Sequence, residues 1–196
     1  CVLDIDAWIE FALKRGYKKV ILSGHSLGTQ KVVYYIGKGK YAKNVAAVIL
    51  LAFADSYAYH NAYVEKRATK DALLREAKKL VKKRKGDTLL RSVYLAHRER
   101  FPKSATSYLS FFGENSELSK ALPLRNKGKL QIYSKIKVPI LAVIGDKQEY
   151  TAISIKDALD LLKKENKLAE VHQIKNCDHD FTGKEKELSS IIARFL

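Results

Sequence analysis

A pentapeptide near the start of the chain, Gly24-His25-Ser26-Leu27-Gly28, has the residue types and spacing of a nucleophile held on a tight turn. A β-branched run precedes it and a helix-compatible run follows it, which predicts a strand, a sharp turn and a helix. A serine at the tip of such a turn projects its hydroxyl clear of the sheet, and the flanking glycines remove side chains that would collide. We therefore predict that Ser26 is a nucleophile and that the Leu27 N–H stabilises an oxyanion.

A serine nucleophile needs a base, and His179 has the most suitable setting among the histidines. It follows the last predicted strand, with Asp178 and Asp180 beside it, where an imidazole can reach the Ser26 proton. His25, inside the pentapeptide, is expected to serve packing or hydrogen bonding instead. The remaining histidines have no comparable setting; they are His60, His97 and His172.

The elements that must position these residues alternate between strand and helix at both ends of the chain. Periodicity predicts helices over residues 4–15, 27–37, 153–166 and 184–196, and strands over 18–23, 45–53, 138–144 and 169–174. This order is typical of an α/β fold with a mostly parallel sheet flanked by helices. The middle segment lacks the alternation, and its main feature is a long amphipathic helix over 64–85. We predict a core made of residues 1–54 and 134–196, and a helical cap inserted over 55–133.

Composition limits the class of protein. A chain of 196 residues with 46% hydrophobic content is globular. The longest apolar run, residues 45–54, is too short to cross a bilayer, so we expect no membrane span and a cytoplasmic location. The two cysteines have no metal-ligand spacing, and we expect neither a metal nor a cofactor.

Charge is the second compositional signal. The net charge of +16 is concentrated in residues 63–103, which contain 14 Lys and Arg against 5 Asp and Glu. Lysine dominates there without interleaved aromatic residues, so we expect a solvated basic surface and no specific nucleic-acid partner. A module that binds polyanions through the basic helix stays open as an alternative. The oligomeric state stays open too.

The chain resembles the α/β-hydrolases. The elbow around Ser26, the strand over 138–145 and the His179 loop follow that family's order of nucleophile, acid and histidine. The segments 104–110 and 179–185 further resemble a little-characterised esterase-like branch. The resemblance implies a serine hydrolase that cleaves carboxylic esters or related acyl compounds through an acyl-enzyme, with a small-molecule acyl substrate. It also implies a second oxyanion donor from a loop that comes before Cys1, so we expect the start of the fold to lie upstream.

The acid is where the sequence departs from the family pattern, because Gln148 occupies the position where members usually place an Asp. Three interpretations stay open. Glu149 or Asp146 supplies the carboxylate after a small shift in the loop, or Asp55 supplies it from the end of an earlier strand. In the third, Gln148 marks a catalytically weakened protein that binds a small molecule without turning it over, because an amide brings no charge to the imidazolium.

Overall fold

The computed structural model describes residues 1–64, 67–91, 94–96, 99–113, 115–147 and 149–196. These residues form two compact units. The first unit is discontinuous in sequence and comprises Cys1–Asp55 and Ala121–Leu196, and the second is Ser56–Lys120. Two of the sequence-predicted positions, His97 and Gln148, lie outside the described residues.

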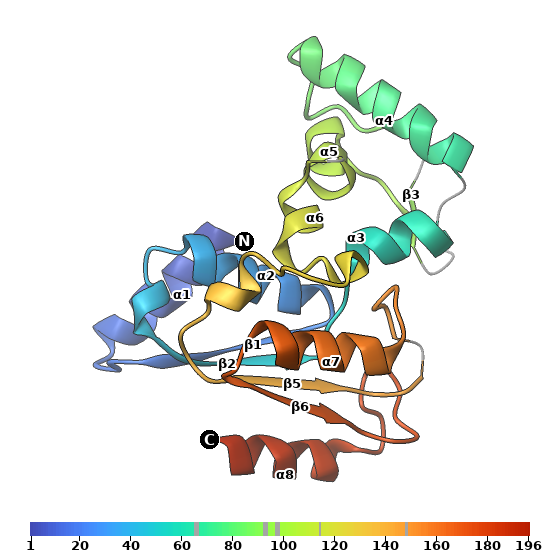
Figure 1. Cartoon of the computed structure of the whole chain (residues 1–196). Coiled ribbons are helices and arrows are strands. Elements are labelled where there is room, and N and C mark those ends of the chain that lie inside the picture. Colours follow the sequence, from blue (N-terminus) through green and yellow to red (C-terminus); the bar gives the residue numbers. More distant parts are fainter. Residues whose placement is uncertain (65–66, 92–93, 97–98, 114, 148) are drawn as a thin grey trace. The chain divides into compact units, whose positions relative to one another are not determined.

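The first unit is a four-stranded parallel sheet with helices on both faces (Figure 1). Strand order in the sheet is β1-β2-β5-β6. The strands are β1 (Val20–His25), β2 (Val45–Leu51), β5 (Ile140–Ile144) and β6 (Ala169–Gln173). The helices are α1 (Val2–Lys14), α2 (Leu27–Lys38), α7 (Ile155–Glu165) and α8 (Glu185–Phe195). Short 3₁₀ turns lie at Ala42–Asn44, Leu124–Asn126 and Tyr133–Lys135.

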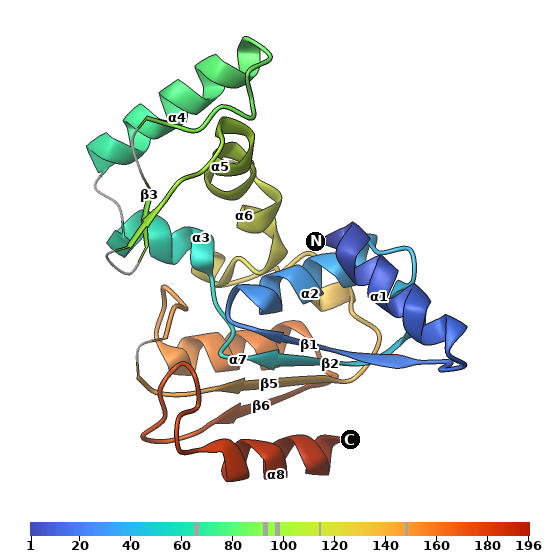
Figure 2. The ribbon, with the colours of Figure 1, turned by 180° about the vertical axis from the view of Figure 1, so that it is seen from behind.

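The two faces of the sheet are covered by different helices. Alternate residues of β2 and β5 point to opposite faces, because side chains in a strand have a period of two. Val48 and Ile140 belong to the cluster packed under α1, α2 and α7, whereas Ile49 and Leu141 belong to the cluster packed under α8. Figures 1 and 2, seen from opposite sides, show α8 on one side of the sheet and the other three helices on the other. β5 is buried along its whole length.

Because all four strands are parallel, the loops that follow their carboxyl ends gather at one edge of the sheet. The elbow follows β1, the loop over 145–150 follows β5, and the loop over 174–184 follows β6. The fold class and the alternation predicted from sequence are confirmed. Each predicted element of this unit appears within a few residues of its expected bounds.

The sequence pattern indicates burial at two places where the structure shows exposure. The apolar run over 18–23 predicts a buried strand, but β1 is an edge strand of the described sheet and Ile21 is 44% exposed. Helical spacing puts Trp8 on the apolar face of the helix over 4–15, but Trp8 is 73% exposed. The packed stripe of α1 is centred on Ile9, and Trp8 lies outside it in edge-to-face contact with Phe11, with ring centroids 6.0 Å apart.

The second unit is mainly helical. Its elements are α3 (Ser56–Tyr59), a π-helical turn (His60–Val64), α4 (Arg67–Lys82), β3 (Tyr94–Ala96), β4 (Glu99–Phe101), α5 (Ala105–Phe112) and α6 (Glu117–Ala121), the last of which ends one residue into the first unit. Leu73 and Ala77 of α4 are fully buried with Tyr108 of α5 in a core of their own. Ser104 caps α5 by accepting a hydrogen bond from the Ser107 N–H.

This unit ends at Lys120 and not at residue 133, where the composition had placed the end of the insertion. The reason is packing. Leu122, Leu124, Leu130 and Tyr133 are fully buried in the hydrophobic cluster of the first unit, so the returning chain joins the sheet domain at once. No helix in the described ranges has the length and apolar character needed to cross a membrane.

Candidate active site

The turn between β1 and α2 holds Ser26 in a strained backbone conformation. Its φ of 54° and ψ of −123° lie in a region that residues with a Cβ rarely occupy, at a cost of about 1–3 kcal/mol. Hydrogen bonds fix this geometry from both sides. The Ser26 N–H donates to the Leu51 carbonyl at 2.9 Å, and the Thr29 N–H and hydroxyl donate to the Ser26 carbonyl at 3.0 and 2.7 Å. The turn is therefore fastened to the neighbouring strand and to its own helix.

The two glycines of the motif have different roles. A Cβ on Gly24 would lie 2.5 Å from the carbonyl carbon and oxygen of Gly28, so the strand and the helix approach too closely for a side chain there. A Cβ on Gly28 would meet nothing within 4 Å. The expectation that both glycines prevent a collision is correct for Gly24 and wrong for Gly28, whose contribution to the close contact comes from its backbone.

Leu27 begins α2, so its N–H is among the first amides of the helix, which have no intrahelical acceptor. The positive end of the helix dipole lies at the same place. An amide in this position, next to Ser26 in the chain, is suited to hold the negative charge that develops on a carbonyl oxygen when the Ser26 hydroxyl oxygen attacks its carbon.

His179 and Glu149 form a hydrogen-bonded pair at the carboxyl edge of the sheet. The Nδ1 atom of His179 lies 2.8 Å from Oε2 of Glu149, and the side chains are 12% and 2% exposed. The other carboxylate oxygen, Oε1, accepts the Gly145 N–H at 2.9 Å. The Tyr150 ring stands edge-on to the imidazole, with centroids 4.5 Å apart. The carboxylate is therefore fixed by the end of β5, and it fixes the imidazole in turn.

His25 connects the elbow to the His179 loop. Its Nε2 lies 2.8 Å from the His179 carbonyl oxygen, and the two imidazole rings are 5.0 Å apart. The predicted hydrogen-bonding role of His25 is confirmed. Because His25 precedes Ser26 directly, this bond seats the backbone of His179 against the turn that carries the serine.

Asp146 does not supply the carboxylate for His179. Its two oxygens accept the backbone N–H groups of Asn176 and Cys177 at 2.9 and 3.0 Å. These hydrogen bonds, Asn176 first, hold the pKa of Asp146 below its ordinary value. The Cys177 carbonyl accepts the Asp146 and Lys147 N–H groups in return, both at 3.0 Å. Asp146 thus fastens the loop after β5 to the loop that carries His179.

Two further groups keep that loop in place. A Cβ on Gly145 would lie 2.4 Å from the Cys177 carbonyl oxygen, so this contact requires glycine. Asp178 accepts the N–H groups of Thr182 and Asp180 at 2.8 and 3.2 Å, and the bonds to Thr182 are the main cause of its lowered pKa. Cys177, within the same loop, is fully buried, and burial raises the pKa of its thiol.

The structure pairs Asp55, the other acid considered, with a cation. Asp55 is fully buried, and both of its oxygens lie 2.9 Å from Nη1 of Arg125. The Arg125 N–H also donates to Asp55 at 3.1 Å. Of the three carboxylates considered from sequence, the structure brings Glu149 to His179, whereas Asp146 bonds to backbone amides and Asp55 to Arg125.

Comparison with known proteins agrees with this architecture. The model of a family described as "Protein of unknown function (DUF1749)" matches residues 2–194. The chain belongs to the DUF1749 family. No curated protein matches it in sequence.

Solved structures place this DUF1749 protein in the α/β-hydrolase fold. It is similar to a monoacylglycerol lipase of Paleococcus ferrophilus, with a TM-score of 0.61 and 16% identity over 99% of this chain and 74% of that one. An α/β-hydrolase fold protein of unknown function gives a TM-score of 0.62 and 18% identity, over 98% and 69% of the two chains. A thermophilic esterase gives 0.52 and 19%, over 100% and 72%. At these identities the likeness establishes the fold.

Sequence reasoning missed two residues of this DUF1749 candidate site, Gly145 and Tyr150, and also Arg125, the partner of Asp55. Gly145 was identified only as the end of a strand, although its N–H anchors Glu149. Tyr150 and Arg125 were not singled out. Tyr150 had a usable signal, since an aromatic residue directly after the candidate acid must lie near the site. Arg125 had none, because it is 70 positions away from Asp55.

Proposed function

We propose that this protein is a serine hydrolase that cleaves carboxylic esters or related acyl compounds of small size through an acyl-enzyme. The observation that carries the proposal is the Glu149–His179 hydrogen bond on a loop seated against the Ser26 elbow. The fold shared with a lipase and an esterase supports the same class of chemistry.

The geometry suggests a role for each group. A carboxylate on Nδ1 keeps the proton of neutral His179 on that nitrogen, which leaves Nε2 as the base. Nε2 takes the Ser26 proton as the hydroxyl oxygen attacks the acyl carbon, and the carbonyl oxygen becomes an oxyanion held by the Leu27 N–H. His179 then gives the proton to the departing alcohol oxygen, which leaves the acyl group on Ser26. Water repeats the sequence and releases the acid.

Glu149 contributes charge as well as orientation. As His179 becomes an imidazolium, a nearby carboxylate stabilises it, and the low exposure of Glu149 strengthens that interaction. Because Glu149 is available to His179, the amide at Gln148 does not by itself deprive the site of an acid. This supports turnover over the alternative of a weakened protein that only binds its ligand.

A fluorophosphonate probe tests the proposal, because it forms a covalent bond only with an activated serine. We expect stoichiometric labelling, with the modified peptide containing Ser26. Ser26→Ala is expected to abolish labelling and to lower ester hydrolysis by several orders of magnitude. Ser23→Ala is the matched control, since Ser23 lies three residues earlier on β1 and is exposed. A folded protein that leaves Ser26 unlabelled would refute the proposal.

The alternative is tested by Gln148→Asp. If Glu149 is the acid, the substitution is expected to change ester hydrolysis by less than about tenfold. A rise of about 10⁴-fold, the size of effect a missing triad carboxylate produces, would favour a natural protein that is weakened at this position.

A further inference from the structure

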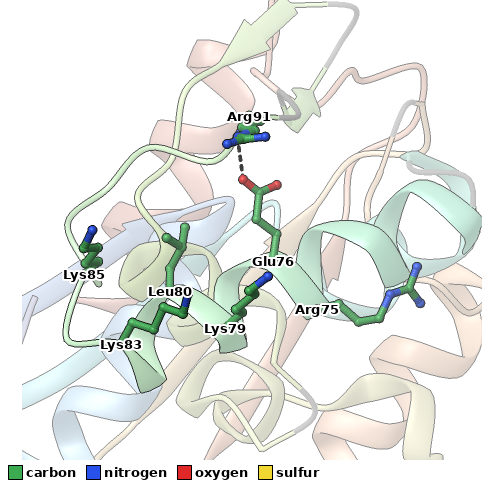
Figure 3. A pocket seen from close by; sticks show the side chains of 7 residues that line it. All are labelled: Arg75, Glu76, Lys79, Leu80, Lys83, Lys85 and Arg91. Atoms are coloured by element: carbon green, nitrogen blue, oxygen red, sulfur yellow. Dashed lines mark hydrogen bonds between the residues drawn. The ribbon is translucent and has the colours of Figure 1, made fainter.

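The second unit contains a basic hollow that the hydrolase chemistry does not use. It has a volume of about 540 Å³ and lies beside the C-terminal half of α4. Figure 3 shows Glu76 and Leu80 pointing from this helix toward the loop that carries Lys85 and Arg91. The described residues that line it are Arg75, Glu76, Lys79, Leu80, Lys83, Lys85 and Arg91.

Local structure holds the two sides of this basic hollow together. Residues 76, 79, 80 and 83 recur at the spacing of one helix face. Beyond the helix, Arg84 adopts a left-handed φ of 57° and the Lys85 N–H donates to the Leu80 carbonyl at 2.9 Å, which turns the chain back. The Arg91 N–H then donates to Oε1 of Glu76 at 3.0 Å. The hydrogen bond between Lys85 and Leu80 therefore holds the chain at the end of α4, and the hydrogen bond between Arg91 and Glu76 holds the returning chain against the helix.

The charge of the lining is strongly one-sided. Five of its described side chains are cationic, and the single carboxylate already accepts the Arg91 amide. Arg75 with Lys79, and Lys79 with Lys83, are like charges four residues apart on a helix, an arrangement that is unfavourable without a counter-charge. The helix dipole accounts for cations in the last turn of α4. It does not account for Lys85 and Arg91, which face the same hollow from outside the helix.

We propose that this basic hollow binds a small ligand bearing two or more phosphate groups. Its volume is in the range of small-molecule sites. Three flexible ammonium groups and two guanidinium groups suit clustered phosphates better than a single carboxylate. Leu80, a half-buried residue of the lining, allows for a small apolar part of the ligand.

The same observations disfavour the larger polyanions. No aromatic side chain is found among the described lining residues, so the stacking platform that single-stranded nucleic acids use is absent from that set. A membrane-binding helix inserts its apolar face into lipid. The apolar face of α4 is instead occupied inside the unit, since Leu73 and Ala77 are fully buried.

Calorimetric titration of the whole chain with inorganic triphosphate at physiological ionic strength tests the proposal. Lys79→Ala/Lys83→Ala removes two charges from the lining, and Lys78→Ala/Lys82→Ala removes two from the same helix outside the lining. Alanine keeps helix propensity in both cases. We expect the first variant to weaken triphosphate binding at least about tenfold, equivalent to about 1.4 kcal/mol, and the second to change it less than about threefold. Ser26→Ala should bind triphosphate as the unaltered chain does.

Three outcomes would overturn the proposal. The first is the absence of triphosphate binding by the unaltered chain. The second is an equal loss in both lysine variants, which would indicate a diffuse surface charge. The third is tighter binding of single-stranded RNA or of phosphatidylserine vesicles than of triphosphate, with the same dependence on Lys79 and Lys83. Arg91→Gln, on the opposite side of the hollow, provides a second variant and is expected to weaken binding as well.

Discussion

Glu149 and His179 lie 30 positions apart in sequence, and their side chains meet at 2.8 Å. The contact depends on the ends of two adjacent parallel strands, because β5 places Gly145 beside Cys177 and the Gly145 N–H then orients the Glu149 carboxylate. The candidate acid and base are therefore products of sheet topology. The residues next to Glu149 and His179 in sequence do not by themselves determine where the two side chains lie.

Replacing the Glu149 carboxylate by an amide separates orientation from charge. Glu149→Gln keeps an acceptor for Nδ1 but removes the charge that stabilises an imidazolium, so we expect ester turnover to fall by about 10⁴-fold. Steady-state kinetics and the rate of fluorophosphonate labelling measure this. Glu170→Gln is the matched control, because Glu170 is also bonded to a histidine, His172, at 2.6 Å, but its side chain is exposed. Equal losses in both variants would rule out the assigned role of Glu149.

The positions of the elements could be predicted from the sequence because their periodicity is local. The strand, tight turn and helix around Ser26 could be predicted for the same reason, since the glycines, the serine and the flanking runs are contiguous in sequence. The identity of the acid could not be predicted from the sequence. Residues 145–150 follow a strand and have no periodicity that shows which side chain faces His179. Three candidates, Asp146, Gln148 and Glu149, lie within four positions. The selection of Glu149 comes from one backbone donor, Gly145, and that donor is set by packing against the Cys177 loop.

The exposure of Trp8 and β1 shows a second limit of the sequence pattern. A hydrophobic stripe identifies a helix but does not decide which of two adjacent apolar residues faces the sheet. Strand composition likewise does not reveal that β1 lies at an edge of the described sheet, where alternate side chains remain exposed.

The two elbow glycines are expected to respond differently to alanine. At Gly24 the added methyl would lie 2.5 Å from backbone atoms of Gly28, which cannot move without distorting the turn. We expect Gly24→Ala to destabilise the protein by about 1–3 kcal/mol. Gly28→Ala is expected to be neutral or stabilising by up to about 1 kcal/mol, because the added methyl has room and alanine favours helix. Denaturant unfolding measures both, and a larger loss at Gly28 would contradict the geometry.

Cys177 is expected to resist alkylation in the folded protein. It is fully buried, and burial is the main reason that the pKa of its thiol is raised, so the reactive thiolate is scarce at neutral pH. Cys1 is exposed, and Cys1→Ser leaves Cys177 as the single thiol. Iodoacetamide should then modify the chain slowly under native conditions and rapidly in denaturant. Rapid modification of this variant by iodoacetamide under native conditions would show that the loop that contains Cys177 opens freely.

Low pH is expected to weaken the attachment between the loop after β5 and the loop after β6. The Asn176 and Cys177 amides depress the pKa of Asp146 in the folded state, so its ionised form is favoured there over the unfolded chain. This contribution is fully present above the ordinary value of 3.8 and is lost as the pH falls through the lower folded value. Asp146→Asn, which keeps one acceptor oxygen, should therefore unfold at lower denaturant than the unaltered protein at about pH 7. The difference should shrink at about pH 3.

Asp160→Asn removes an exposed carboxylate paired with Lys156 on α7, and serves as the control. A difference for Asp146→Asn that does not depend on pH would show that its carboxylate does not fasten these loops through its charge.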